Sequence, residues 1–466
     1  MALSAIFDRL RQGAAAPALT AQPGAPLEDP EDFLFGVEPL KILVSPLAGD
    51  TSGHSARHIY DRLAGRIGIS VEMAERPLAT AGSDNDQPVF LSMAVDLGRR
   101  WLARENVDLL IWGECVATPP LKPEMPPGQS WRLRFLGATT PVHAQGATVS
   151  ALERLEVPAF FSADIAELVF GAALAAVNVE SLEGLRARGG LFVPTLSAVT
   201  RVAEDDSYGT VSECATKQAC YAALLLLDGA RTGNPITLEK AVSVYRGALI
   251  LGEDAFNPHE QALLGMHIAD ALTLIADSGA DEKLIDKAID YYRTALGMVR
   301  RDTFADDFAG LKTRLGVALQ EKAELSGEIH YLDQAADAFS AATAIWTLSE
   351  APARWADIQN SLGGLLITMG KLAKQPSLFD KAVAVFLKIT EVMGRTKAPL
   401  VWATTLANIG AALKEKGVAA GNANYLEKAA EAFDQAEQVF SELHLDGSVR
   451  LIETQRAQVL ALLGQK

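Results

Sequence analysis

A short polar segment after the first predicted strand carries the side chains best suited to contact a small ligand. Asp50, Thr51, Ser52 and His54 lie in the segment AGDTSGHS, which follows the apolar run LKILVS and leads into a predicted helix. Backbone amides at such a strand-to-helix turn can bind an anionic group. The segment has neither the Gly-Lys-Ser/Thr of a Walker A loop nor a GxGxxG fingerprint. Two interpretations therefore stay open: a weak ligand-binding loop, and a polar turn in which Ser or Thr caps the helix.

Two histidines and a cysteine near this segment could also take part in chemistry. His54 and His58 are one helical turn apart, a spacing that can hold a metal ion, but the glutamate of an HExxH motif is absent. Cys115 follows Glu114 at a predicted strand end, and the sequence places no histidine to activate it as a nucleophile. We therefore assign no catalytic residue, no metal ligand and no cofactor, and we expect a protein that is not an enzyme.

Residues 38–160 supply the elements that would position these side chains. Short apolar or alternating runs predict strands, and longer amphipathic runs predict helices. The strands are predicted at 40–45, 69–73, 107–113 and 131–136, and the helices at 52–65 and 89–105. Because strands and helices alternate, we expect an α/β domain in which at least part of the sheet is parallel. The proline-rich residues 118–128 are predicted to form a hairpin loop.

The order of these motifs resembles the small α/β domain at the N-terminus of the TolB family, which bacterial regulators also place beside helical repeats. The shared features are ILVSPLAGD, with a proline after the first strand, then DLLIWGEC, and then the polar strand WRLRFLGAT. The resemblance implies a domain that binds or senses and does not catalyse.

The C-terminal half of the chain repeats itself every 47 residues. An alanine recurs at positions 241, 288, 335, 382 and 429, and an aromatic residue follows it four residues later each time. Short apolar blocks begin at 221, 268, 315, 362 and 409 in the same register. Each unit holds two helical patterns, and Pro258, Pro352 and Pro399 mark helix boundaries between units. A repeat of this length predicts an α-solenoid.

The small-then-aromatic spacing resembles the tetratricopeptide family, whose pattern has Leu-Gly in the first helix and Ala, aromatic, Ala in the second. Leu362-Gly363 matches the first part of this pattern, and Ala382 with Phe386 matches the second. The repeat is longer here than that family's usual length of about 34 residues. The resemblance implies a right-handed solenoid of five repeats over residues 210–466, with a C-terminal capping helix and a concave groove lined by the first helices.

The family pattern also implies which side chains line this groove. They lie three residues before the glycine position and one residue after it. These groove candidates are Met266, Asp270, Thr313, Val317, Asn360, Gly364, Ala407 and Ala411. We expect a protein or peptide partner to bind there. Trp355 and Trp402 share one repeat position, which is more typical of packing between repeats than of a binding platform.

The N-terminus carries a second candidate for docking. Residues 1–12 form an amphipathic helical pattern with Leu3, Ile6, Phe7 and Leu10 on one side, and an Ala/Pro/Gly-rich flexible linker follows at residues 13–37. Such a helix could dock on a partner or on a membrane surface, or it could be a frayed terminus or a helix folded onto its own domain. Residues 161–209 are predicted to form a helical connector between the α/β domain and the solenoid.

Composition excludes several classes of function. The net charge of −16 argues against general binding to nucleic acid and against adhesion to an anionic membrane. No apolar run reaches the length of a membrane span, so no integral membrane segment is expected. Three cysteines without metal-binding spacing favour a reducing compartment, and we expect a cytoplasmic protein.

Together these patterns favour a non-enzymatic adaptor or scaffold whose repeats bind a protein partner, with the α/β domain as a second contact or sensing surface. One alternative is a small-molecule or nucleotide-sensing α/β module, which could be enzymatic, regulated by the solenoid. The other is a self-assembling structural protein, that is, a homo-oligomer.

Overall fold

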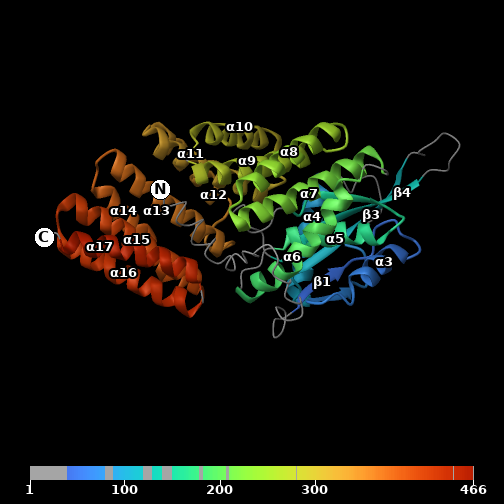
Figure 1. Ribbon diagram of the computed structural model, residues 1–466, viewed down its shortest axis with the longest axis horizontal. Helices are drawn as coiled ribbons and strands as arrows, with labels where there is room; N and C mark the ends of the chain where they lie inside the picture. Colours follow the sequence, from blue (N-terminus) through green and yellow to red (C-terminus); the bar gives the residue numbers. More distant parts are fainter. Residues whose placement is uncertain are drawn as a thin grey trace, which may run out of the picture. The chain divides into compact units, whose positions relative to one another are not determined.

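The computed structural model describes residues 39–78, 88–118, 128–138, 149–177, 182–205, 209–279, 281–443 and 445–464 (Figure 1). The predicted docking helix with Leu3, Ile6, Phe7 and Leu10, the linker after it and most of the proline-rich loop lie outside these residues. The described residues form two compact units. The first covers residues 39–278 and 297–304, and the second covers residues 279–296 and 305–464.

The first unit is built on a five-stranded mixed sheet with the order β2-β1-β3-β4-β5. Strand β1 (Leu40–Val44) pairs in parallel with β2 (Ile69–Met73) and with β3 (Leu109–Thr118). Strand β4 (Gly128–Gly137) pairs antiparallel with β3, and β5 (Arg154–Pro158) pairs antiparallel with β4. The expectation of a partly parallel sheet is confirmed. Strand β5 was not predicted, because it is only five residues long and carries two charged side chains.

Helices cover both faces of this sheet. Helix α3 (His54–Leu63) and helix α5 (Ala163–Ala176) contact one face, and α4 (Pro88–Glu105) contacts β3 and β4 from the other. The alternation of side chains along β4 shows the division. Trp131 lies beside His58 of α3, whereas Leu136 lies against Gly98 of α4. The unit continues with helices α6 (Leu182–Ala203), α7 (Val211–Thr232), α8 (Pro235–Leu251) and α9 (Pro258–Gly279).

Buried charges join the sheet to α9. On the face of the sheet opposite α3, Arg154 of β5 forms ion pairs with Glu156 at 3.0 Å and with Glu260 of α9 at 3.1 Å. Arg132 of β4 binds Glu156 at 2.9 Å and Glu114 of β3 at 3.3 Å. Because each charge has a partner of opposite sign, the row can be buried without leaving a bare ion.

The same repeat position fixes α7 and α9 to the rest of the first unit. Glu213 and Glu260 are 47 residues apart, each in the first turn of its helix. Glu213 completes a capping box with Thr210 and accepts a hydrogen bond of 2.5 Å from Ser130 of β4. Glu260 accepts a hydrogen bond from the backbone amide of Asn257 and pairs with Arg154. In α7 and in α9, the glutamate at this position thus caps its own helix and also holds that helix to the sheet.

The second unit is entirely helical in the residues described. It contains α10 (Glu282–Met298), α11 (Ala305–Ser326), α12 (His330–Thr343), α13 (Pro352–Leu372), α14 (Ser377–Met393), α15 (Pro399–Ala420), α16 (Ala423–Glu442) and α17 (Asp446–Gly464). Helices α13 and α15 begin at the predicted prolines, where the missing amide hydrogen is not needed. Within the units, α7 pairs with α8, α11 with α12, α13 with α14 and α15 with α16.

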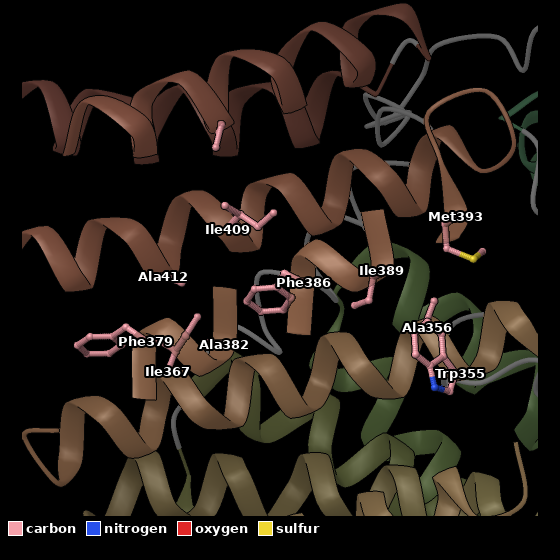
Figure 2. Packing of buried hydrophobic residues seen from close by; sticks show 11 residues of the cluster. Trp355, Ala356, Ile367, Phe379, Ala382, Phe386, Ile389, Met393, Ile409 and Ala412 are labelled. Atoms are coloured by element: carbon pink, nitrogen blue, oxygen red, sulfur yellow. The ribbon is translucent and has the colours of Figure 1, made fainter. Parts of the chain in front are cut away.

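One glycine–aromatic contact closes each pair of the second unit. A Cβ atom on Gly316 would lie 2.7 Å from the Phe339 ring, and one on Gly410 would lie 2.8 Å from the Phe433 ring. Gly363 and Phe386 make the same contact in the α13–α14 pair. Figure 2 shows the Phe386 ring among the buried side chains between these helices. The Leu-Gly glycine of the first helix and the aromatic residue of the second helix therefore mark a close contact between the two helices.

A second small–large contact recurs near the ends of α13 and α15. Gly370 lies under the Phe379 ring, and Gly417 lies under Leu426, where an added Cβ would be 2.8 Å from the leucine side chain. These pairs are also one repeat of 47 residues apart. The sequence held this signal, but the more regular alanine and aromatic series concealed it. Two contacts per pair fix both the distance and the angle between the helices.

Candidate functional site

The loop after β1 is organised by a single carboxylate. Asp50 Oδ1 accepts hydrogen bonds from the Ser52 amide at 2.9 Å, the Ser52 hydroxyl at 2.6 Å and the Gly53 amide at 3.0 Å. Asp50 Oδ2 accepts from the Ser55 amide at 2.8 Å and from the Ser55 hydroxyl at 2.5 Å. Partial burial by itself would raise the pKa of Asp50. The hydrogen bonds from Ser52 and Ser55 outweigh it and hold the pKa well below its usual value.

The hydrogen bonds of Asp50 determine the role of the loop in the folded chain. The loop follows the carboxyl end of β1. In the sheet, β2 lies on one side of β1 and β3 on the other, and α/β proteins commonly bind ligands at such a position. Yet the amides at the start of α3 already bind Asp50, and the left-handed Gly53, with φ of 69°, turns the chain to allow it. Thr51 and His54 are exposed, and the His54 backbone amide donates a hydrogen bond of 3.3 Å to the Ser52 hydroxyl and not to Asp50. The loop is a capped turn, and ligand binding there stays a prediction.

The two histidines belong to a row of rings. The His54 and His58 rings stack with centroids 6.4 Å apart, His58 lies 6.1 Å from Trp131, and Trp131 lies 5.2 Å from Phe161. The row runs from α3 across β4 to the segment before α5. Within the described part of the chain, no group of three or more His, Cys, Asp or Glu side chains is arranged to hold a metal ion.

Cys115 lies beside the capped turn, and its amide donates a hydrogen bond of 2.8 Å to the carbonyl of Ala48. Burial, together with the negative charges of Asp50 and Glu114, raises the pKa of the Cys115 thiol to about 11. At neutral pH this thiol is therefore protonated and a poor nucleophile. Glu114 pairs with Arg132, so the Glu114–Cys115 segment is part of the structure of the sheet.

Replacing Asp50 with alanine should lower the stability of the first unit by about 1–2 kcal/mol at pH 7, because the start of α3 loses its cap. Folding lowers the pKa of Asp50, so its stabilising effect is complete above its unfolded pKa of about 4 and is lost as the pH falls below that value. Calorimetric melting of both proteins from pH 7 to pH 3 should show the difference in Tm narrowing only below pH 4. Asp254→Ala, at an exposed position, is the control. A difference that persists unchanged at pH 3 would contradict this role.

The groove candidates do not form an open surface. Seven of the eight are buried, and Val317 is half-buried. The buried ones are Met266, Asp270, Thr313, Asn360, Gly364, Ala407 and Ala411. The expectation that these side chains line an accessible groove is corrected on this point, although whether a partner binds near them stays a prediction.

Contacts between successive first helices explain this burial. Asn360 of α13 donates a hydrogen bond of 3.2 Å to Thr405 of α15, and Asn408 of α15 donates one of 3.2 Å back to Asn360. Thr368 of α13 donates a hydrogen bond of 2.8 Å to Glu324 of α11. Polar side chains within the helical array therefore bind one another and hold α11, α13 and α15 together. Sequence reasoning placed such polar residues in a groove because it could not show which helix they would face.

The repeated aromatic residues of the first helices also lie in packing contacts. Trp355 is 6% exposed and belongs to the hydrophobic cluster between α13, α14 and α15. Lys388 of α14 lies over its ring at 5.6 Å, and Arg395 lies over the Trp402 ring at 5.8 Å. The predicted packing role for Trp355 fits this environment.

Comparisons with known proteins add little to these contacts. No protein-family model and no curated protein matches the chain. Among solved structures, it is similar to one described as the TPR2AB-domain:pHSP90-complex of yeast Sti1. The identity is 18%, the match covers 57% of this chain and 92% of that chain, and the TM-score is 0.19. A TM-score this low establishes no shared arrangement of helices, so the description of the repeats rests on the contacts above. The resemblance of residues 38–160 to the TolB family stays a prediction.

The second helices of the pairs are the parts of the repeats most exposed to solvent. Each second helix of the second unit carries an exposed acidic residue at the same repeat position, 47 residues from the next. We call this set the acidic column, and it consists of Asp286, Asp333, Asp380 and Glu427. Lysines follow directly at 287, 381 and 428, whereas α12 contains no lysine or arginine. The charge of the acidic column is therefore least balanced on α12.

Lysines of the following first helices bind alternate members of the acidic column. Lys322 of α11 forms an ion pair with Asp286 at 2.7 Å, and Lys416 of α15 pairs with Asp380. Desolvation would lower the pKa of Lys322, but its carboxylate partners outweigh this effect and raise it. Among the described residues, no ion pair is formed by Asp333 or Glu427. These two side chains are therefore available to a partner.

No helix among the described residues is both long enough and apolar enough to cross a bilayer.

A hollow lined by described residues lies between β5, α5 and α7, beside Glu213 and Lys217, and holds about 20 Å³. A space of this size has room for about one water molecule. It is therefore too small for an organic ligand.

Proposed function

We propose that this chain is a non-enzymatic interaction scaffold, in which tetratricopeptide-like helical repeats hold a protein or peptide partner. The α/β domain, tied to α7 and α9 by buried charges, would give the first repeats a rigid base and a second contact surface. A reducing, cytoplasmic compartment would suit its three free cysteines.

The observation that carries this proposal is the repeated helix pair. In α11–α12, α13–α14 and α15–α16 the same glycine–aromatic contact sets the same approach of two helices. Every pair then turns an equivalent face of its second helix to solvent. Arrays of this kind build extended surfaces that bind partners without a deep pocket.

The acidic column indicates which partner would fit. Its members recur at one position per repeat, and Asp333 and Glu427 are exposed. One turn further along the same faces lie further acids, Asp337 and Glu431, each four residues after a column member. Like charges at this spacing destabilise a helix slightly, so they are more readily explained by binding than by folding. The net charge of −16 adds attraction over a longer range. We therefore propose a basic or amphipathic partner.

Affinity purification from the native cell with the full chain as bait tests this proposal. Asp333→Lys combined with Glu427→Lys should reduce recovery of the partner by roughly tenfold, because two unpaired charges of the acidic column are reversed. The control is Glu350→Lys with Glu391→Lys, which makes the same change of charge at exposed positions outside the column. Equal loss with both variants, or no loss with either, would contradict the proposed surface. Melting curves establish that all three baits are folded.

A further inference from the structure

Helix α17 occupies the place of a sixth first helix. It packs against α16, where Arg456 forms ion pairs with Asp434 at 2.5 Å and with Glu437 at 3.5 Å. It is also held by α15, where Lys414 donates a hydrogen bond of 2.9 Å to Gln455. Helices α13 and α15 pack in the same way against the second helices that precede them, α12 and α14.

The repeat register shows which side of α17 would receive a second helix. Ala457 and Gly464 follow Gly410 and Gly417 by 47 residues. In α15 these two glycines are covered by Phe433 and Leu426 of α16. On α17 Ala457 is exposed, and a Cβ atom added to Gly464 would have no neighbour within 4 Å. The positions that accept a second helix are therefore present on α17, and no described residue covers them.

The composition of this side of α17 is unlike that of an end cap. The terminal helices of repeat arrays usually turn a polar face to solvent. Residues 457–464 of α17 read AQVLALLG, with one polar side chain, and only Val459 is buried. Leu460 is 49% exposed. We define the α17 face as Ala457, Leu460, Ala461 and Gly464.

We propose that the α17 face binds an amphipathic helix of a partner protein that carries the pattern of this chain's own second helices. That pattern is a large apolar residue, alanine three residues later, an aromatic residue four after that, and a small or apolar residue three further on. It reads Leu332, Ala335, Phe339 and Ala342 in α12, and Leu426, Ala429, Phe433 and Ala436 in α16.

The occupant follows from the continuity of the array. The α17 face repeats the small residues of α15, and α15 shows directly that a leucine and a phenylalanine ring cover them. A helix with the same spacing would bury Leu460 and place its aromatic ring over Ala457. Alanine is tolerated at this position, because Ala222 and Ala269 hold it in the first two repeats. This inference goes beyond the proposed function, since the α17 face would bind a helix whatever contacts the acidic column.

A fluorescent peptide with the sequence of residues 423–443, the helix of α16, tests the inference against the full chain by fluorescence anisotropy. We expect saturable binding that weakens at least tenfold when the peptide carries Phe433→Ala. The same loss is expected when the full chain carries Ala457→Arg, and Leu460→Lys serves as a second variant in case the first disturbs folding. Both side chains are exposed in the folded chain. If the peptide instead displaced the native α16, we would expect binding to be unchanged in these variants.

Three results would overturn the inference. The first is the absence of saturable binding, and the second is binding that survives both variants of the chain. The third comes from analytical ultracentrifugation: self-association of the wild-type chain that Ala457→Arg abolishes would show that a second copy covers the face. Failure here would leave the acidic-column experiment unaffected, because Ala457 and Leu460 are not part of the acidic column.

Discussion

Replacing Phe386 with alanine should lower the free energy of unfolding of the second unit by about 3–5 kcal/mol, the range for buried phenylalanine truncations. The Phe386 side chain is fully buried, covers Gly363 and lies in one cluster with Ala382, Ile389 and Ile409. Figure 2 shows it enclosed between helices, so the cavity left by truncation has walls from more than one of them. Helices on both sides would have to move to fill it, and the two contacts of each pair resist that movement.

Chemical denaturation followed by circular dichroism measures this loss. Leu387→Ala is the matched control, because Leu387 is the next residue on α14 and is 53% exposed. Its truncation should cost no more than about 0.5 kcal/mol. If the two variants were equally stable, the glycine–aromatic contact would not be the element that holds the pairs together.

Replacing Arg154 with alanine should destabilise the first unit by about 3–5 kcal/mol, since removal of one partner leaves buried charges unpaired. Arg154 binds Glu156 and Glu260, its side chain is 5% exposed, and it also donates a hydrogen bond to the carbonyl of Ala255. The cost comes mainly from the two carboxylates that remain in a poorly hydrated place. Replacement of Arg154 and Glu260 together should therefore cost less than the sum of the two single replacements.

Tryptophan fluorescence during denaturation reports on this unit through Trp101, Trp112 and Trp131, and on the second unit through Trp346, Trp355 and Trp402. The control is Arg57→Ala, which breaks an exposed ion pair with Asp61 and should cost at most about 1 kcal/mol. An Arg154→Ala variant no less stable than this control would show that the sheet and α9 do not depend on the buried row.

The buried contacts between the sheet and helices α7 and α9 also limit how the chain can be divided into fragments for experiments. The sequence suggests a boundary near residue 210, between connector and repeats. Ser130 to Glu213, Glu156 to Thr216 and Arg154 to Glu260 are contacts that cross this point within the first unit. A fragment that began at residue 210 would expose Glu213 and Glu260, which are buried in the full chain. Binding experiments are therefore better made with point variants of the full chain.

The sequence by itself determined the period of 47 residues, the two helices of each repeat and the start of α13 and α15 at their prolines. It also determined that the sheet is partly parallel. These features depend on contacts within one helix, within one helix pair or along one strand. Local spacing such as that from Ala382 to Phe386 is enough to specify them.

Only the tertiary structure decided which side chains reach solvent. Asn360 looks like a groove residue in the repeat pattern, but the next first helix supplies Thr405 and Asn408 as its partners. Arg154 and Glu260 look like surface charges, yet they meet inside the first unit from positions more than one hundred residues apart. In the sequence, the backbone amides at the start of α3 look free to bind a ligand, but Asp50 accepts hydrogen bonds from those of Gly53 and Ser55. In each case the outcome depends on a partner that is distant in sequence or on a choice between competing hydrogen bonds, and residue spacing carries no information about either.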